Sequence, residues 1–121
     1  MPTDNTFFHK DTYDNDIRLD INEDVLERIY GDNIKPTDEL NVNFAFITDT
    51  QVKADKFADI LKSTYKNYTD IKVGPYDEQF EVTGLTDKIK MNIQEINDWN
   101  KKMWDFGYKY DCKLDGWYVG T

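Results

Sequence analysis

The sequence contains one cysteine and one histidine among its 121 residues. A lone cysteine excludes an internal disulfide and fits a reducing compartment, so we expect a cytoplasmic protein. A structural zinc site needs about four ligands, mostly Cys and His, so no metal site of this kind is predicted. No apolar run approaches the roughly 18 residues needed to cross a bilayer, and we expect no membrane interaction.

Catalytic signatures are also missing. No glycine-rich phosphate-binding sequence occurs, and His9 lies far in sequence from Cys112, so neither a phosphate cradle nor a nucleophile–base pair is indicated. We interpret Cys112 as a core residue. The run Asp20–Asp24 starts like a calcium loop, but Val25 stands where that loop needs glycine and Gly31 where it needs glutamate. The sequence therefore predicts no catalytic residues, no bound metal and no cofactor.

Negative charge is abundant and unevenly distributed. The formal net charge is -9; residues 1–40 carry eleven acidic against four basic residues, net -7, and residues 41–121 carry the other -2. Such a chain repels phosphate backbones, so direct nucleic-acid binding is not expected. A basic protein surface would be attracted, although the same charge also serves solubility.

Residues 1–40 are predicted to form an acidic extension that packs on the core of the protein. Ile17, Leu19 and Ile21 alternate with polar residues and indicate a short strand. A short helix is predicted over residues 23–30, capped by Asn22 and ended by Gly31.

Residues 41–121 follow a different pattern. Alternating apolar residues predict strands at Val42–Phe46, Ile71–Val73 and Phe80–Val82, and helical periodicity follows the first and the third. Thr48, Asp49 or Thr50 is expected to cap the first of these helices, and Gly107 to end the second. Alternation from Tyr108 to Leu114 then predicts the last strand. The order strand, helix, strand, strand, helix, strand is typical of the α+β ferredoxin-like fold, a split βαβ (βαββαβ) sheet with two crossover helices.

The last strand carries a recognisable ending. It contains Lys113-Leu114-Asp115-Gly116-Trp117, and Gly120-Thr121 follows. With the order of elements, the motif Asp115-Gly116-Trp117 makes residues 41–121 resemble the RraB family, protein regulators of ribonuclease E. The resemblance implies a ferredoxin-like domain over these residues and a non-enzymatic role, in which the protein binds a nuclease and reduces RNA cleavage.

These observations favour a non-enzymatic acidic protein that inhibits a nuclease by covering it. The partner would be a basic protein, a nuclease or the nuclease domain of a toxin. The predicted partner-binding residues are Asp14, Asp16, Asp20, Glu23, Asp24, Glu27, Trp117 and Tyr118. One alternative is an immunity protein that neutralises an antibacterial toxin encoded beside it. Others are a small-molecule-binding or enzymatic ferredoxin-like domain, and a structural module. For Trp117, closing the end of the core is the favoured alternative to partner binding.

Overall fold

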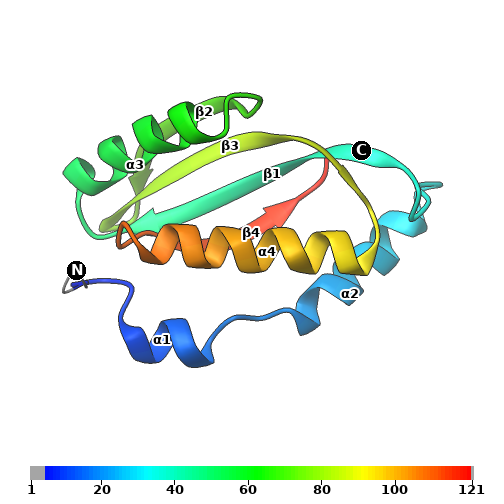
Figure 1. Ribbon diagram of the computed structural model, residues 1–121, viewed down its shortest axis with the longest axis horizontal. Helices are drawn as coiled ribbons and strands as arrows, with labels where there is room; N and C mark the ends of the chain where they lie inside the picture. Colours follow the sequence, from blue (N-terminus) through cyan, green and yellow to red (C-terminus); the bar gives the residue numbers. More distant parts are fainter. Residues whose placement is uncertain (1–4, 121) are drawn as a thin grey trace.

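A computed structural model describes residues 5–120 of the chain. The elements in chain order are α1 (Lys10–Asn15), α2 (Asp20–Tyr30), β1 (Glu39–Thr48), α3 (Gln51–Thr64), β2 (Thr69–Tyr76), β3 (Gln79–Lys90), α4 (Ile93–Tyr108) and β4 (Lys113–Tyr118). From β1 onward this is the predicted order of strands and helices (Figure 1).

The four strands form one sheet in the order β2-β3-β1-β4, with every neighbouring pair antiparallel. The predicted ferredoxin-like α+β fold is therefore confirmed. Phe46 of β1 lies opposite Val82 of β3 and Leu114 of β4, and all three side chains are buried. Because residues that lie opposite each other share a face of the sheet, these three mark the face on which the core forms.

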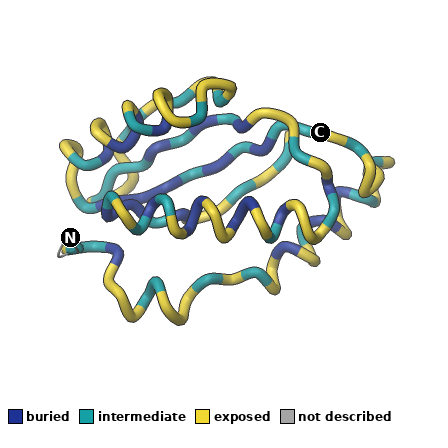
Figure 2. The backbone as a smooth tube through the Cα atoms, viewed as in Figure 1, coloured by how far each residue is buried: buried dark blue, intermediate teal, exposed yellow. Residues whose placement is uncertain are grey.

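Helices α3 and α4 both pack on that face. The ring of Phe57, from α3, lies 4.7 Å from the ring of Phe46, and Gly107 brings α4 against the same phenylalanine. Both helices have buried positions recurring along one side, as Figure 2 shows. Thr50 caps α3, as one of the three predicted candidates, by accepting a hydrogen bond from the backbone N–H of Lys53.

The N-terminal segment packs along α4 (Figure 1). Phe8 is completely buried, with its ring 4.7 Å from that of Trp104 and 5.2 Å from that of Tyr108. The indole N–H of Trp104 donates a hydrogen bond to the backbone carbonyl of Tyr13 (2.9 Å). Across residues 5–120, no helix is both long enough and apolar enough to span a membrane.

Two predictions for the N-terminal segment are wrong. Residues 17–19 belong to no strand, and Ile21 lies inside α2, which begins at Asp20. Asn22 does not cap this helix, because Leu19 occupies the N-cap position and Asn22 is buried within the first turns. The Asn22 side chain instead forms hydrogen bonds with residues far away in sequence, Asn97, Asn100 and Trp117.

The predicted end of α4 is also wrong. The helix runs past Gly107 to Tyr108, and residues 109–112 form a turn in which the N–H of Cys112 donates to the carbonyl of Gly107 (2.9 Å). Asp111 adopts a positive φ of 58° in this turn, so β4 begins only at Lys113. A side chain at position 107 would collide with the Cys112 carbonyl, so the glycine serves close packing and does not end the helix.

Candidate functional site

A groove of about 250 Å³ lies between α2 and β4, and we call it the α2–β4 groove. Its apolar lining includes Ile21 and Val25 from α2, Trp104 from α4, and Leu114 and Trp117 from β4. The groove forms because β4 is an edge strand and α2 lies beside α4. A concave apolar surface with a few polar groups is the usual form of a binding site.

The family-like motif contributes directly to this groove. Asp115, Gly116 and Trp117 all line it. Leu114 lies opposite Phe46, whereas Gly116 lies opposite the neighbouring residue of β1, so Asp115 is an additional residue that forms a bulge. A bulge redirects side chains locally, and here Asp115 and Gly116 are both exposed.

Trp117 is attached to α2 through a buried amide. Its indole N–H donates a hydrogen bond to Oδ1 of Asn22 (2.8 Å), and the amide nitrogen of Asn22 donates to Oδ1 of Asn97 (2.9 Å) and of Asn100 (3.1 Å). This network joins α2, α4 and β4 around the groove. The sequence does contain a signal for it: Asn22 stands four residues before Leu26 on the same helical face, and so falls on the buried stripe.

Tyr118 does not share the groove with Trp117. Trp117 lies opposite Phe44, which is buried in the core, whereas Tyr118 lies opposite Asn43. Since successive residues of a strand point to opposite faces, Tyr118 is directed to the face of the sheet away from the helices, where 64% of its surface is exposed.

Two of the predicted acidic contact residues already have partners within the chain. Asp14 forms an ion pair with Lys10 (2.9 Å), and Asp20 forms one with Arg18 (3.1 Å). Hydrogen bonding to Arg18, with the attraction of its charge, lowers the pKa of Asp20. Both pairs are exposed, where such pairs contribute little stability.

The other acidic residues are divided between two sides of α2. Asp16 lines the α2–β4 groove. Glu23 and Glu27 lie on the opposite side of the helix, beside a second hollow of about 400 Å³ whose lining includes Ile93. Asp24 is exposed and lines neither hollow. The structure therefore does not gather the predicted acidic set on one face.

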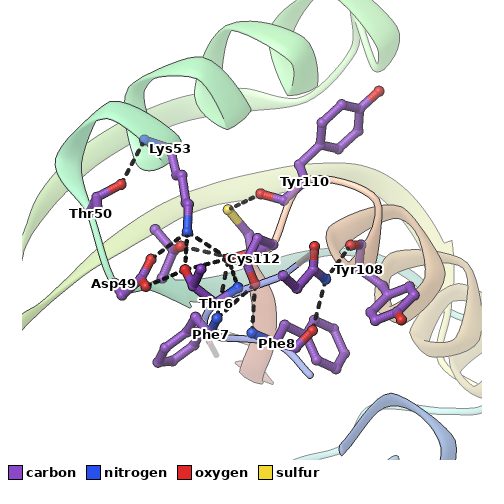
Figure 3. A network of polar contacts seen from close by, with 12 residues as sticks. Thr6, Phe7, Phe8, Asp49, Thr50, Lys53, Tyr108, Tyr110 and Cys112 are labelled. Atoms are coloured by element: carbon purple, nitrogen blue, oxygen red, sulfur yellow. Dashed lines mark hydrogen bonds and ion pairs between the residues drawn. The ribbon is translucent and has the colours of Figure 1, made fainter. Parts of the chain in front are cut away.

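A second polar network holds the beginning of the described chain (Figure 3). The backbone N–H groups of Thr6, Phe7 and Phe8 donate to the carboxylate of Asp111, and the ammonium of Lys53 lies 2.6 Å from the same carboxylate. Burial alone would raise the pKa of Asp111, but the hydrogen bonds from Lys53 and from these backbone groups outweigh it and lower the pKa.

Lys53 has several partners in this network, because its ammonium also contacts Asp49 (2.8 Å) and the hydroxyl of Thr6 (2.6 Å). Figure 3 shows its side chain reaching from the start of α3 toward both residues. The charges of Lys53, Asp49 and Asp111 all contact groups of the chain itself, so the cluster is an anchor for the N-terminal segment. Sequence reasoning did not identify it, because no local pattern connects residues 6–8 with residue 111.

Neither Cys112 nor His9 lines the α2–β4 groove. Cys112 is fully buried, as predicted, and burial raises the pKa of its thiol to about 12. His9 is exposed and precedes α1. Within residues 5–120, no group of three or more His, Cys, Asp or Glu side chains is placed to hold a metal ion.

Comparison with known proteins places these elements in a family context. The family model RraB, described as "Regulator of ribonuclease activity B", matches residues 19–119. The match runs from just before α2 through β4, and so includes the elements that build the α2–β4 groove; Thr121 of the motif lies outside the described residues. No curated protein matches the chain.

Proposed function

Because the chain belongs to the RraB family of regulators of ribonuclease activity, we propose that it binds a ribonuclease and reduces RNA cleavage by covering part of the enzyme. It acts as a binding protein and performs no chemistry itself. The observation that carries this proposal is the family match, which spans α2, α4 and β4 together. The division into a regulatory domain at residues 41–121 and an acidic extension at residues 1–40 stays a prediction, and the family match, which begins at residue 19, also takes in α2.

Charge supports a protein partner over an RNA partner. The chain carries a formal charge of -9, and residues 1–40 account for -7 of it. Phosphate backbones would be repelled, whereas a basic surface on the ribonuclease would be attracted, and association would be accelerated by about 10- to 1000-fold. Inhibition would then follow because the basic surface that holds RNA is occupied by the acidic protein.

The α2–β4 groove is the proposed centre of the contact. It presents apolar side chains together with Asp16 and Asp115, and the predicted contact residue Trp117 forms part of its wall. The indole N–H of Trp117 is already bonded to Asn22, so this residue offers its ring surface to a partner. Glu23 and Glu27, on the other side of α2, and the exposed Asp24 would act at longer range as steering charges outside the groove.

A cleavage assay tests the proposal. Purified ribonuclease E from the same cell would be incubated with a fluorescent single-stranded RNA and increasing amounts of the chain. We expect the rate of RNA cleavage to fall as the chain is added, in proportion to the molar ratio of chain to enzyme. Titration calorimetry should show a complex of the two proteins. Unchanged cleavage together with no heat of binding would contradict the proposal, as would RNA cleavage by the chain alone.

A control distinguishes inhibition through binding to the ribonuclease from inhibition through binding to the RNA substrate. The chain should not shift the labelled RNA in an electrophoretic mobility assay, since its charge opposes RNA binding. The immunity-protein alternative shares the mechanism of occlusion; it would be favoured instead if the chain bound a toxin nuclease encoded next to it and not ribonuclease E. A cytoplasmic location stays a prediction, which cell fractionation can check.

A further inference from the structure

The hollow on the side of α2 opposite the α2–β4 groove has a volume of about 400 Å³, and we call it the α2–α4 hollow. It forms where α2 lies beside the start of α4 (Figure 1). Its apolar lining consists of Leu26 and Tyr30 from α2, Pro36 from the loop before β1, and Ile93 from α4. Helix α2 is therefore a ridge with an apolar depression on each side.

The walls of the α2–α4 hollow are held in place by the chain itself. The hydroxyl of Tyr30 donates a hydrogen bond to the carbonyl of Met91 (2.6 Å), which joins the end of α2 to the start of α4. The loop that carries Pro36 is attached at the same place, because the N–H of Met91 donates to the carbonyl of Asp38 (2.9 Å). The hollow is thus formed before a partner arrives, and binding there requires little ordering of this chain.

Ile93 gives the hollow an apolar surface that the core does not cover. It is the first residue of α4, and 41% of its surface is exposed, whereas Ile96, three residues later, is completely buried. Removing apolar surface from water is the main driving force of protein association. A partner that covers Ile93 would therefore gain affinity from it.

The charged residues that line the α2–α4 hollow are both acidic, Glu23 and Glu27. They stand four residues apart on α2, and neither forms an ion pair with any residue in the range 5–120. Glu23 lies in the first turn, where the helix dipole favours a negative charge, but Glu27 lies beyond that turn. Like charges at this spacing destabilise a helix. A cation bound in the hollow would relieve this repulsion.

Positive groups nearby do not reverse the sign of the hollow. Arg28, Lys35 and Lys90 are close in sequence to lining residues, but none of them lines the hollow. The positive end of the α4 dipole, at the N-cap Asn92, amounts to about half a charge, and Glu95 in the first turn of α4 opposes it. The two carboxylates therefore dominate, and the complementary occupant is positively charged. The α2–β4 groove has no such sign, because both acidic and basic residues line it.

We infer that the α2–α4 hollow receives a segment of the partner ribonuclease that carries arginine or lysine, with an adjacent apolar side chain packed on Ile93. This inference rests on the proposed function and identifies which surface of the partner is covered. A ribonuclease surface that holds RNA needs cationic side chains to contact the phosphates. Pairing such a side chain with Glu23 and Glu27 would remove it from RNA binding. The two glutamates would then act at short range as well as by steering.

The dissociation rate distinguishes docking in the hollow from steering alone. A charge at the rim of an interface acts mainly on the association rate, whereas a charge pair that becomes buried acts on the dissociation rate. Surface plasmon resonance with immobilised full-length ribonuclease E would measure both rates. We expect Glu27→Gln to raise koff by about tenfold or more, at high salt as well as at low salt. Asp24→Asn removes the same charge from an exposed position of α2 that lines neither hollow, and should leave koff unchanged.

Ile93→Ala tests the apolar part of the contact without a change in charge. We expect koff to rise by about tenfold, as when an apolar side chain is no longer buried in an interface, and kon to stay the same. Val52→Ala is the matched control, because Val52 is 78% exposed on α3 and does not line the hollow; both rates should stay unchanged. Urea denaturation would show that the variants fold. If Ile93→Ala failed to fold, Glu27→Gln would decide.

The outcomes separate this inference from the proposed function. If the wild-type chain does not bind the ribonuclease, the proposed function falls and this inference falls with it. If the wild-type chain binds but koff is unchanged in either folded variant, docking in the hollow is overturned and the regulatory function stands. An effect of Glu27→Gln on kon alone would belong to this case. A dimer of the chain that Ile93→Ala abolishes would identify a second copy as the occupant and would also overturn the inference.

Discussion

Trp117 and Asn22 are hydrogen-bonded side chain to side chain, with 2.8 Å between the indole nitrogen and the amide oxygen. The pair joins the last strand to the second helix, and the same amide binds Asn97 and Asn100 of α4. Every hydrogen-bonding atom of the Asn22 side chain thus has a partner, as burial demands. One residue thereby fixes the relative position of the elements that form the α2–β4 groove.

Replacing this residue should loosen the groove. Asn22→Ala removes three hydrogen bonds and leaves the Trp117 N–H without its acceptor. We expect the free energy of unfolding to fall by about 1–3 kcal/mol, the usual penalty for an unsatisfied buried polar group. Urea denaturation followed by tryptophan fluorescence would measure it. Asn67→Ala, at an exposed position, is the matched control and should be neutral; equal stability of both variants would contradict the assigned role of Asn22.

Gly107→Ala should reverse the usual effect of this substitution in a helix. Alanine normally stabilises a helix interior by about 1 kcal/mol relative to glycine. At position 107 the new methyl group would collide with the carbonyl of Cys112, which is fixed because the Cys112 N–H is bonded to the Gly107 carbonyl. We expect a loss of about 1–3 kcal/mol from overpacking, measured by urea denaturation. Gly74→Ala, which meets no atom within 4 Å, should show no such loss.

The core of the fold could be predicted because it depends on regular patterns. Val42, Phe44 and Phe46 alternate in the sequence, and all three are buried in β1. Ile96, Trp99 and Met103 follow helical spacing, and all three are buried in α4. In these stretches local pattern and tertiary burial agree, so periodicity alone was sufficient.

The failures occur where a distant contact determines the local structure. The alternation from Tyr108 to Cys112 resembles a strand, but Asp111 turns the chain there and its carboxylate receives the N–H groups of residues 6–8. Asn22 resembles a helix cap, but its amide is used by α4 and β4. For the candidate site, the sequence indicated Asp115-Gly116-Trp117. It could not show which of Trp117 and Tyr118 faces the helices, because a bulge sets the register.

The Asp111 anchor should make stability depend on acid pH. Its pKa is lowered in the folded protein, so its contribution is fully present above the unfolded value of about 3.9 and is lost as the pH falls through the folded pKa. Asp111→Asn should cost about 2 kcal/mol at neutral pH, since the bonds with Lys53 and three backbone N–H groups lose their charge. Thermal unfolding between about pH 3 and 7 would measure both effects.

Two variants serve as controls for the pH dependence of stability. Asp111→Asn should show a smaller loss of stability below about pH 4 than the wild-type chain, because its anchor no longer titrates. Asp98→Asn, at an exposed position on α4, should retain the wild-type profile. A wild-type profile for Asp111→Asn would show that the carboxylate does not anchor residues 6–8.

Charge reversal on α2 tests the predicted steering role. Glu23→Lys combined with Glu27→Lys should slow association with the ribonuclease by about tenfold at low salt, with a smaller effect at high salt. Stopped-flow fluorescence would measure the rate. Asp55→Lys combined with Asp59→Lys makes the same charge change at exposed positions of α3. If both double variants slowed association equally, net charge alone would account for the rate, and α2 would have no special part.

Cys112 reports on how the core opens. The thiolate is the reactive form of cysteine, and burial raises the pKa of this thiol to about 12. At about pH 8 the folded chain would hold only about one part in 10,000 as thiolate, so a disulfide reagent such as Ellman's should react only when the chain unfolds. Labelling should therefore be slow in buffer and fast in concentrated urea.

The same labelling rate should follow global stability. If modification of Cys112 requires unfolding, the rate is proportional to the unfolded population, which rises about tenfold for each 1.4 kcal/mol of lost stability. Asn22→Ala lies on α2, away from the turn that holds Cys112, yet it should accelerate labelling by the factor that its urea denaturation gives. If labelling were instead unchanged in Asn22→Ala, the turn at residues 109–112 would open locally, and the packing of α2 against α4 and β4 would not control access to the core.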